Sequence, residues 1–289
     1  MRCVAFKQVD VFSPANFGGN PVAVILDAED LDAEDMQRIA RWTNLSETAF
    51  VLPPTQAQAS YRVRIFTPRQ ELAFAGHPSL GTAHAVMEAA VASPRDGVLL
   101  QECGAGLLPV RLEFDGDVRR LFVRAPEARF GVAEPALAQA LADALGAPLL
   151  PHPAPRAVNV GPTWIVAQLA DGAAVRSLSP SMDALVALSR RHDAVGVSVF
   201  GREHGDTHFA VRSFAPIDGI AEDPVCGSGN AAIGAFLREA GQLPGPRWVV
   251  SQGRECSREG RVWTTVAGDG SVEIGGRTTT RIDGVIRLD

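Results

Sequence analysis

The chain has 289 residues, of which 46% are hydrophobic and 21% are charged, and its formal net charge is −6. This composition is typical of a globular protein with one large or two smaller domains, each able to bury a core. The acidic balance and the absence of basic runs argue against a nucleic-acid or anionic-membrane partner. No apolar run reaches the ~20 residues that a membrane-spanning helix needs.

Several cofactor chemistries are disfavoured by residue counts. Lys7 is the sole lysine and lies in a strand-like segment, which excludes a phosphate-binding loop and makes a pyridoxal Schiff base improbable. The cysteines, Cys3, Cys103, Cys226 and Cys256, are widely spaced without a C-x-x-C pair. We therefore expect no metal, no cofactor and no disulfide framework, and a cytoplasmic location; the charged N-terminal segment does not resemble a signal peptide.

Strand-like runs bounded by Gly, Pro, Asp and Asn follow one another along the first half of the chain. The first helix is predicted at 31–42, where acidic residues open an amphipathic pattern that turns Met36, Ile39 and Ala40 inward. Extended segments are predicted at residues 9–12, 22–26, 49–52, 62–66, 98–100 and 107–112.

The pattern of the first half recurs in the second at an offset close to half the chain. Arg64-Ile-Phe-Thr-Pro68 is repeated as Arg212-Ser-Phe-Ala-Pro216, and each copy is followed by a Pro-containing turn and a helix of small residues. The run that ends at Gln101 is matched by the run that ends at Gln252. This order predicts two homologous domains, 1–124 and 125–289, with the last strand, 280–289, able to return to the first domain.

The two small-residue helices, one after Pro78 and one from Cys226 to Glu239, lack a polar face. A helix that is apolar all round is buried on all sides. Because the neighbouring segments are mostly strands, we predict an α+β fold of two pseudo-symmetric domains, each a barrel-like sheet wrapped around a central helix.

The starts of these helices are candidate sites. His77-Pro78 and Asp223-Pro224 each predict a helix with proline in its first position, and Asp223 is expected as an N-cap. First-turn N–H groups carry partial positive charge and suit a carboxylate ligand. On frequency alone, a purely structural N-cap is the more common role for such an aspartate, but the Gly227-Ser-Gly229 run favours a site because it exposes backbone N–H groups.

Glu47 is the second candidate. If Glu47 lies on a strand, it shares a face with Ala49 and Val51, where loss of hydration would make its carboxylate a better base. A solvent-facing glutamate at the end of a strand is the alternative. Nearby, Arg69 and Glu71 could form a loop ion pair of little energetic weight.

Other motifs carry less signal. Ser228 lacks the G-x-S-x-G context of a nucleophile elbow, and the Gly205-Asp206 pair between His204 and His208 makes a shared metal doubtful. Cys226 could be a reactive thiol, because Cys-Gly-Ser-Gly resembles a segment of cofactor-independent amino-acid racemases. The matching first-half position has no cysteine, so we read Cys226 as a small buried residue near the site.

Four segments together carry a family resemblance that covers nearly the whole chain. They are Val9–Phe12 with Phe17-Gly-Gly-Asn-Pro21, Leu45-Ser-Glu-Thr-Ala-Phe50, Phe66-Thr-Pro68 with Ala75-Gly-His-Pro78, and Asp223-Pro-Val-Cys-Gly-Ser228. In this order they resemble the PhzF-like isomerases of phenazine biosynthesis. That family is similar in fold to diaminopimelate epimerase, with the active site between two barrel domains.

The resemblance implies a set of site residues. Glu47 matches the catalytic carboxylate that moves a proton between substrate carbons, while His77, Asp223 and Ser228 match positions that line the site and orient or protonate the substrate. Substrate-binding positions are assigned to Gly19, Asn20, Gly76, Pro78, Ser79, Cys226, Gly227 and Gly229. Cys226 departs from the family, where threonine is more usual, so the substrate need not be the phenazine precursor.

The sequence therefore predicts a metal- and cofactor-independent isomerase that acts on a small anionic carboxylate by acid–base catalysis with Glu47. Its implied assembly is a homodimer. Two alternatives remain: an amino-acid racemase or epimerase that uses Cys226 with Glu47 or His77 as the opposite base, and a non-catalytic carboxylate-binding protein on the same fold.

Overall fold

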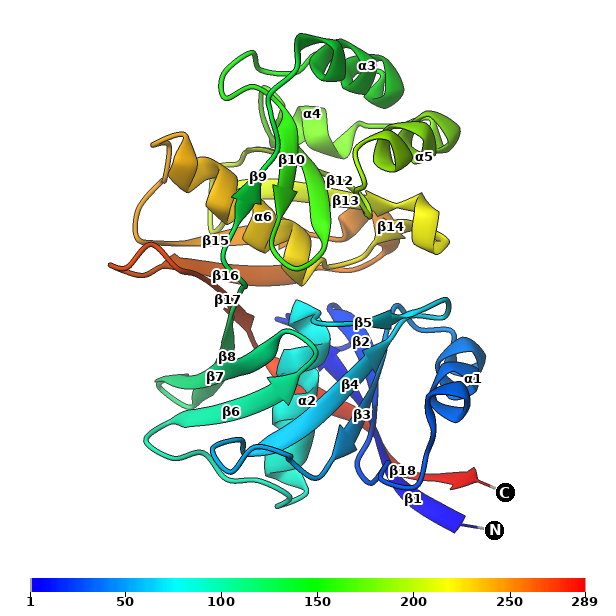
Figure 1. Ribbon diagram of the computed structural model, residues 1–289. Coiled ribbons are helices and arrows are strands. Elements are labelled where there is room, and N and C mark those ends of the chain that lie inside the picture. Colours follow the sequence, from blue (N-terminus) through cyan, green and yellow to red (C-terminus); the bar gives the residue numbers. More distant parts are fainter. Residues whose placement is uncertain (1, 289) are drawn as a thin grey trace. The chain divides into compact units, whose positions relative to one another are not determined.

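The computed structural model describes residues 2–288 and divides the chain into two compact units (Figure 1). The first unit contains residues 2–124 and 275–288, and the second contains residues 125–274. The C-terminal segment from residue 275 onward therefore belongs to the first unit rather than to the second.

In the first unit, both helices and the strands β1 to β8 lie within residues 2–124. Its elements are β1 (Arg2–Val11), β2 (Asn20–Ile25), α1 (Ala33–Thr43), β3 (Thr48–Leu52), β4 (Tyr61–Phe66), β5 (Glu71–Leu72), α2 (Gly76–Glu88), β6 (Val98–Cys103), β7 (Gly106–Asp115), β8 (Val118–Arg124) and β18 (Thr278–Leu288). The strands and the first helix predicted from the sequence all form, with ends shifted by a few residues.

The second unit contains the remaining elements. They are β9 (Arg129–Phe130), α3 (Pro135–Leu145), β10 (Arg156–Asn159), β11 (Thr163–Gln168), α4 (Gly172–Arg176), α5 (Met182–Arg191), β12 (Gly196–Arg202), β13 (Phe209–Ala215), η1 (Pro216–Asp218), β14 (Ile220–Asp223), α6 (Gly227–Glu239), β15 (Arg247–Gln252), η2 (Arg254–Cys256) and β16 (Gly260–Val266). The strand β17 (Val272–Gly276) carries the chain back into the first unit.

Strand pairing in the two units follows one scheme. In the first unit β1 pairs antiparallel with β2, β2 parallel with β3, β3 antiparallel with β4, and β4 parallel with β6. In the second unit β10, β11, β12, β13 and β15 pair in the same sequence of directions. Each parallel pair is joined through a helix, as parallel pairing requires a long crossover. The duplication predicted from the sequence is thus confirmed in the topology.

Each unit encloses one helix. The helix α2 contacts strands on every side of its unit, including β1, β2, β4, β7 and β8 (Figure 1). Its residues from Gly76 to Val86 are all buried. The helix α6 occupies the equivalent place against β10, β11, β12 and β16. The predicted arrangement of a curved sheet around a central helix is confirmed in both units.

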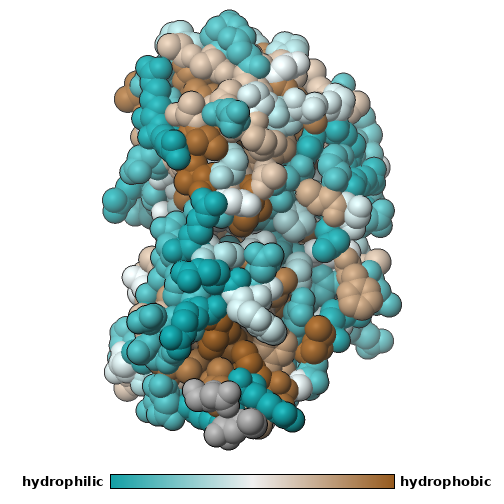
Figure 2. Space-filling model, turned by 90° about the vertical axis from the view of Figure 1, so that its right-hand side faces the viewer, coloured by the Kyte–Doolittle hydropathy of each residue, from teal (hydrophilic) through white to brown (hydrophobic). Residues whose placement is uncertain are grey.

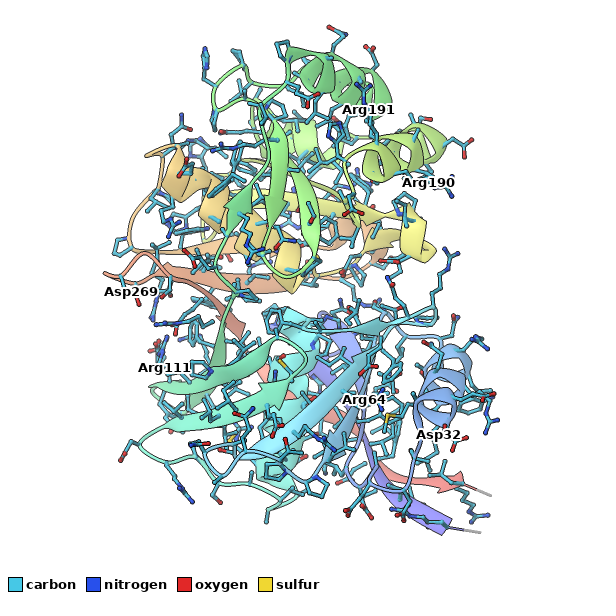
Figure 3. The ribbon with its side chains drawn as sticks, viewed as in Figure 1. Asp32, Arg64, Arg111, Arg190, Arg191 and Asp269 are labelled. Carbon is cyan, nitrogen blue, oxygen red and sulfur yellow. The ribbon has the colours of Figure 1, made fainter. Side chains whose placement is uncertain are left out.

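The outer helices are amphipathic and cover one side of each sheet. In α1, Asp32 is the N-cap and accepts a hydrogen bond from the Asp35 backbone at 2.8 Å (Figure 3). Met36 and Ala40 are buried against Phe50 and Phe66, and Ile39 packs at the rim of this cluster. In the second unit α3 and α5 pack on a separate core with β11 and β12. No helix of residues 2–288 is both long and apolar enough to cross a membrane.

The repeated arginines make equivalent ion pairs. Arg64 binds Glu71 through two hydrogen bonds of 2.7 Å, and its guanidinium lies 5.2 Å from the centre of the Phe66 ring. Antiparallel pairing of β4 with β5 brings Glu71 opposite Phe66 and so within reach of Arg64.

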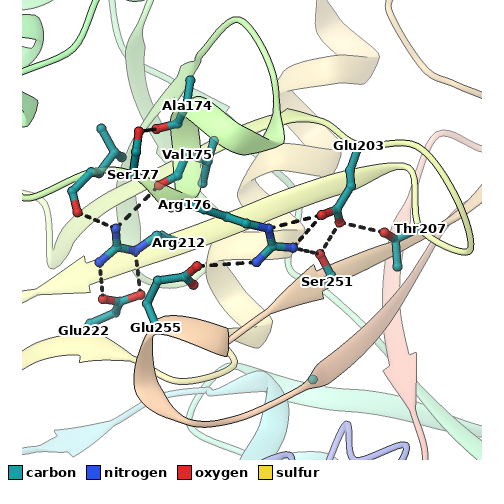
Figure 4. Close-up of polar contacts among 12 residues, drawn as sticks. Ala174, Val175, Arg176, Ser177, Glu203, Thr207, Arg212, Glu222, Ser251 and Glu255 are labelled. Atoms are coloured by element: carbon teal, nitrogen blue, oxygen red, sulfur yellow. Dashed lines mark hydrogen bonds and ion pairs between the residues drawn. The ribbon is translucent and has the colours of Figure 1, made fainter.

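In the second unit Arg212 binds Glu222 at 2.9 and 2.7 Å and lies 5.0 Å from the Phe214 ring centre. Arg212 also donates to the carbonyl of Leu178 at 2.6 Å, so it holds a helix end as well as a carboxylate (Figure 4). Each copy of the motif therefore contains an arginine–glutamate ion pair, but the surroundings of the two pairs differ.

Candidate functional site

Glu47 lies in the turn between α1 and β3, one residue before the strand begins. The turn follows Asn44, which ends α1 in the left-handed conformation with a φ of 53°. Its two sides are joined by a hydrogen bond of 2.8 Å between the hydroxyls of Thr43 and Thr48. This bond holds the backbone on both sides of Glu47, whose side chain is only 12% exposed. The solvent-facing alternative is therefore wrong.

His77 lies against this glutamate. Its Nε2 atom is 3.5 Å from Oε2 of Glu47, and the imidazole side chain is 3% exposed. His77 is the second residue of α2, so a helix start and the turn before β3 bring the two side chains together within the first unit. The candidate carboxylate and the candidate histidine thus form one pair.

The protonation of His77 follows from its surroundings. Burial lowers its pKa to about 3, and a hydrogen bond to the backbone of Pro21 opposes this shift only in part. Proline has no N–H, so the imidazole donates to the Pro21 carbonyl. Among the described residues Nε2 has no hydrogen-bond partner, which assigns this donor to Nδ1. The neutral ring therefore turns the lone pair of Nε2 toward Glu47.

The Gly19–Asn20 segment adjoins this pair through Pro21. The Gly19 N–H donates to Oδ1 of the buried Asp10 at 2.9 Å. A Cβ on Gly19 would lie 2.1 Å from the carbonyl oxygen of Val11, so only glycine fits. Asn20 is fully buried at the first position of β2.

The start of α2 differs from the prediction. The helix begins at Gly76 with Ala75 as its N-cap, which places Pro78 third in the helix rather than first. Ala75 provides no side-chain cap. The Ser79 hydroxyl instead donates to the carbonyl of Ala75 at 2.8 Å and accepts from Nε2 of Gln101 at 2.9 Å. The strand β6 therefore fixes the first turn of the helix.

The start of α6 also differs. The helix begins at Gly227 with Cys226 as N-cap, and the Cys226 sulfur accepts from the Gly229 N–H at 3.2 Å. Asp223, predicted as N-cap, ends β14 and instead accepts from the Val225 N–H at 3.2 Å. Pro224 is consequently outside the helix. The N-cap is Cys226 rather than Asp223 because Pro224 and Val225 lie in an irregular segment between β14 and α6.

The Cys226 thiol is poorly suited to act as a base. Burial, followed by the nearby charge of Asp223, raises its pKa well above the ordinary value of a cysteine. The side chain is 2% exposed. The stabilised thiolate considered from the sequence is therefore not supported, because burial outweighs the partial positive charge of the helix start.

Ser228 is oriented by a residue that the sequence did not single out. Trp164, in β11, donates its indole N–H to the Ser228 hydroxyl oxygen at 3.0 Å. Gly229 follows, and a Cβ there would lie 2.7 Å from the Ser198 hydroxyl and 2.8 Å from the Ser213 hydroxyl. This close approach explains the glycine after Ser228.

Gln252 is the second residue that sequence reasoning missed. Its Oε1 accepts from the Cys226 N–H at 3.1 Å and from Nδ2 of Asn230 at 2.8 Å, and its Nε2 donates to the carbonyl of Asp223 at 3.2 Å. It holds the start of α6 as Gln101 holds the start of α2. The internal repeat places Gln101 and Gln252 at matching positions in the sequence, and this match could have identified Gln252.

The site residues thus form two sets. The first unit holds Glu47 and His77 with Gly19, Asn20, Gly76, Pro78 and Ser79, and the second holds Asp223, Cys226, Gly227, Ser228 and Gly229. Within residues 2–288 no group of three or more His, Cys, Asp or Glu side chains is placed to hold a metal ion.

Comparison with known proteins identifies the family. The phenazine biosynthesis-like protein family, PhzC-PhzF, matches residues 9–284. The chain belongs to this family. It is 40% identical over 97% of both chains to "Antisense-enhancing sequence 1" of Schizosaccharomyces pombe. It is 35% identical to the trans-2,3-dihydro-3-hydroxyanthranilate isomerase of Pseudomonas aeruginosa, over 96% of this chain and 98% of that enzyme.

The fold is shared with solved PhzF-family structures. The Bacillus anthracis phenazine biosynthesis protein of the PhzF family superposes with a TM-score of 0.85 over the full length of both chains, at 24% identity. The resemblance on which the sequence analysis relied is thus confirmed for the family and the fold.

Proposed function

We propose that this PhzF-family chain is an isomerase that moves a proton between carbon atoms of a small carboxylate, with Glu47 as its acid–base group and without a metal or cofactor. The observation that carries the proposal is the Glu47–His77 pair. A buried carboxylate oxygen lies 3.5 Å from an imidazole nitrogen whose protonated form is strongly disfavoured.

This pair suits proton transfer. Because His77 is neutral, it does not neutralise the Glu47 carboxylate as an ion-pair partner would, and the carboxylate keeps its capacity to accept a proton. The lone pair on Nε2 can accept a hydrogen bond from the protonated Glu47 carboxyl group, which orients that proton without taking it up. Positioned acid–base catalysis of this kind contributes typically ~10²–10⁴-fold to a rate.

The helix starts supply the complementary charge. Gly76 and Gly227 are the first residues of α2 and α6, where backbone N–H groups carry partial positive charge. The family resemblance assigns them to the substrate carboxylate, and Asp223 and Ser228 to its orientation. Negative charge that develops beside the carbon losing a proton is stabilised by such donors.

The racemase alternative needs Cys226 as a base. The raised pKa of this buried thiol and the absence of a matching cysteine in the first half of the sequence both disfavour that role. Isomerisation by Glu47 requires neither a thiolate nor a second cysteine.

The test is hydrogen exchange at carbon. The protein is incubated in D₂O with a panel of small carboxylic acids that includes trans-2,3-dihydro-3-hydroxyanthranilate, and loss of C–H signals is followed by NMR. We expect isomerisation with deuterium incorporated at the newly protonated carbon. Glu47→Gln keeps the side-chain shape and should lower the rate ~10²-fold or more.

Glu29→Gln is the matched control, because Glu29 is exposed in the same unit. A Glu47→Gln rate equal to that of the control would remove the acid–base assignment. Binding of a carboxylate by the wild-type protein, without exchange or isomerisation of any panel member, would support the non-catalytic alternative.

A further inference from the structure

A small polar pocket lies at the loop between β12 and β13 in the second unit. Its volume is about 240 Å³, and the residues that line it are Arg202, Glu203, His204, Gly205, Thr207 and His208. This lining differs from the apolar surface of the first unit, which Figure 2 shows in its lower half on the side of α1 and both chain ends. The pocket at the loop therefore suits a polar ligand.

The loop is held in place at its base. The Glu203 N–H donates to the carbonyl of His208 at 3.0 Å, and the Thr207 hydroxyl donates to the Glu203 carboxylate at 2.7 Å. Arg176 in α4 and Ser251 in β15 bind the same carboxylate (Figure 4). Two neighbouring elements thus fix the loop, so the pocket is formed before a ligand binds.

The acidic groups of this segment are paired with arginines from outside it. Burial opposes the ionisation of Glu203, but the hydrogen bonds just described lower its pKa to about 2. Asp206 pairs with Arg261 at 3.3 Å. Both carboxylates therefore repel an incoming anion less than they would without these partners.

The basic groups of the segment are not paired in this way. Among residues 2–288, Arg202 has a ring contact with Phe209 at 5.6 Å but no hydrogen bond or ion pair, and His204 has no partner. The Nδ1 atom of His208 accepts from the Val249 N–H at 3.3 Å, so Nε2 carries the proton of this ring. A guanidinium charge and imidazole donors are thus available to a ligand.

The backbone at the tip of the loop adds further donors. The N–H groups of residues 204–207 make no hydrogen bond to any residue that the structure describes. Gly205 has a φ of 118°, which favours glycine, and beyond its two chain neighbours no atom lies within 4 Å of the position that a Cβ would occupy. The tip is therefore open, and free backbone N–H groups of a turn suit an anion.

We propose that this pocket, called here the hairpin pocket, binds a phosphate group. Arginine forms paired hydrogen bonds with phosphate and with carboxylate alike. A carboxylate has only two oxygens, however, whereas a phosphate can also accept from the imidazoles and the loop N–H groups. The volume of about 240 Å³ is several times the ~30 Å³ of one water molecule, which leaves room for inorganic phosphate or for the phosphate of a small ester.

The hairpin pocket lies apart from the candidate catalytic residues of its unit. Asp223 pairs with Ser213 near the far end of β13, and the Ser213 hydroxyl is one of the groups close to Gly229. About 13 Å of extended backbone separate Phe209, where β13 begins, from Ser213. Binding in the pocket can therefore be measured independently of any isomerase activity.

NMR titration of the full-length chain with inorganic phosphate, at constant pH and ionic strength, tests the proposal. The ring signals of His204 and His208 should shift saturably, with a Kd of ~1 mM or tighter. Those of His152 and His192, which lie outside the pocket in the same unit, should not shift. Absence of a saturable shift at His204 and His208 would overturn the proposal.

Variants test the donors. Arg202→Gln should weaken phosphate binding about tenfold or more, because hydrogen bonds from a charged group are lost, and His204→Ala should weaken it about two- to tenfold. Arg190→Gln is the matched control, at an exposed arginine of α5 in the same unit, and should bind as the wild type does (Figure 3). Circular dichroism verifies the fold of each variant. Equal affinities of Arg202→Gln and Arg190→Gln for phosphate would contradict the proposed site.

The choice of anion identifies the ligand class. Acetate replaces phosphate in one titration and glycerol 3-phosphate replaces it in another. Tighter binding of glycerol 3-phosphate than of inorganic phosphate would assign the pocket to a phosphate ester, and the reverse order would assign it to the free anion. Acetate that binds as tightly as both would show a general anion site and would overturn the assignment to phosphate.

Discussion

The side-chain amide of Asn230 donates a hydrogen bond of 2.8 Å to Oε1 of Gln252, and both residues are 1% exposed. The equivalent contact in the first unit joins Gln101 to Ser79 at 2.9 Å. In each unit a glutamine from the strand after the central helix binds the fourth residue of that helix. The repeat thus preserves a polar brace for the helix start, although the helix residue has changed.

Gln252→Leu should destabilise the protein. The leucine offers no acceptor to the Cys226 N–H or to the Asn230 amide, and each buried donor left unpaired costs about 1–3 kcal/mol. The measurement is the free energy of unfolding from urea titration. Gln58→Leu, at an exposed glutamine, is the control. Equal unfolding free energies for the two variants would contradict the role of Gln252.

The two copies of the Arg–Glu pair should differ in energetic weight. The side chains of Arg212 and Glu222 are 8% and 13% exposed, whereas those of Arg64 and Glu71 are 30% and 41% exposed. Removing one partner of a buried pair costs about 3–5 kcal/mol, because the other charge remains buried. An exposed pair contributes about 0–1 kcal/mol.

We therefore expect Arg212→Met to lower the free energy of unfolding by about 3–5 kcal/mol. Arg64→Met, the matched change in the other unit, should lower it by about 1 kcal/mol or less. The comparison uses the same method and buffer for both variants. A larger loss for Arg64→Met than for Arg212→Met would show that burial does not decide the strength of these pairs.

The fold was predictable because its signals are local or repeated. Extended runs bounded by Gly, Pro, Asp and Asn predicted the strands, and the recurrence of the Arg64 segment at Arg212 predicted the duplication. The helix starts were misplaced because Pro78 and Pro224 carry a statistical preference for the first helical position. In the structure, Ala75 and Cys226 occupy the N-cap positions instead, and only Cys226 accepts a hydrogen bond from its helix through its side chain.

The contacts that position the site depend on strand pairing across the chain. Glu71 binds Arg64 because β4 and β5 pair antiparallel, and this pairing cannot be predicted from the local sequence pattern. The approach of His77 to Glu47 likewise joins two elements that are not neighbours in sequence. The family resemblance named both residues, but their distance and the neutral state of the imidazole required the structure.

Cys226 should be unreactive in the folded protein. Its thiol is buried and its pKa is raised, whereas Cys3 is exposed. With iodoacetamide at pH 8, peptide mass spectrometry should find Cys3 modified in the native state and Cys226 modified only after unfolding. Cys226→Ala should keep the isomerase rate within about tenfold, a smaller loss than acid–base catalysis contributes. Rapid native alkylation of Cys226 with loss of the activity would instead favour the thiol-based racemase.

The burial of His77 should make stability depend on pH. Its pKa in the folded chain is about 3, against about 6.5 in an unfolded chain. Below pH 6.5 the unfolded chain therefore takes up a proton that the folded chain does not, and the free energy of unfolding falls by about 1.4 kcal/mol per pH unit until pH 3.

His77→Gln removes this difference in proton uptake. Between pH 7.5 and 4.5, the unfolding free energy of the wild-type chain should fall by about 2–3 kcal/mol more than that of His77→Gln. Urea titrations of both proteins at four pH values in this range measure the gap. Buried groups away from this pair act equally in the two proteins, so the change in the gap reports on His77 together with its neighbour Glu47. Parallel curves would show that the folded chain protonates His77 as readily as the unfolded chain does, and the neutral imidazole beside Glu47 would have to be abandoned.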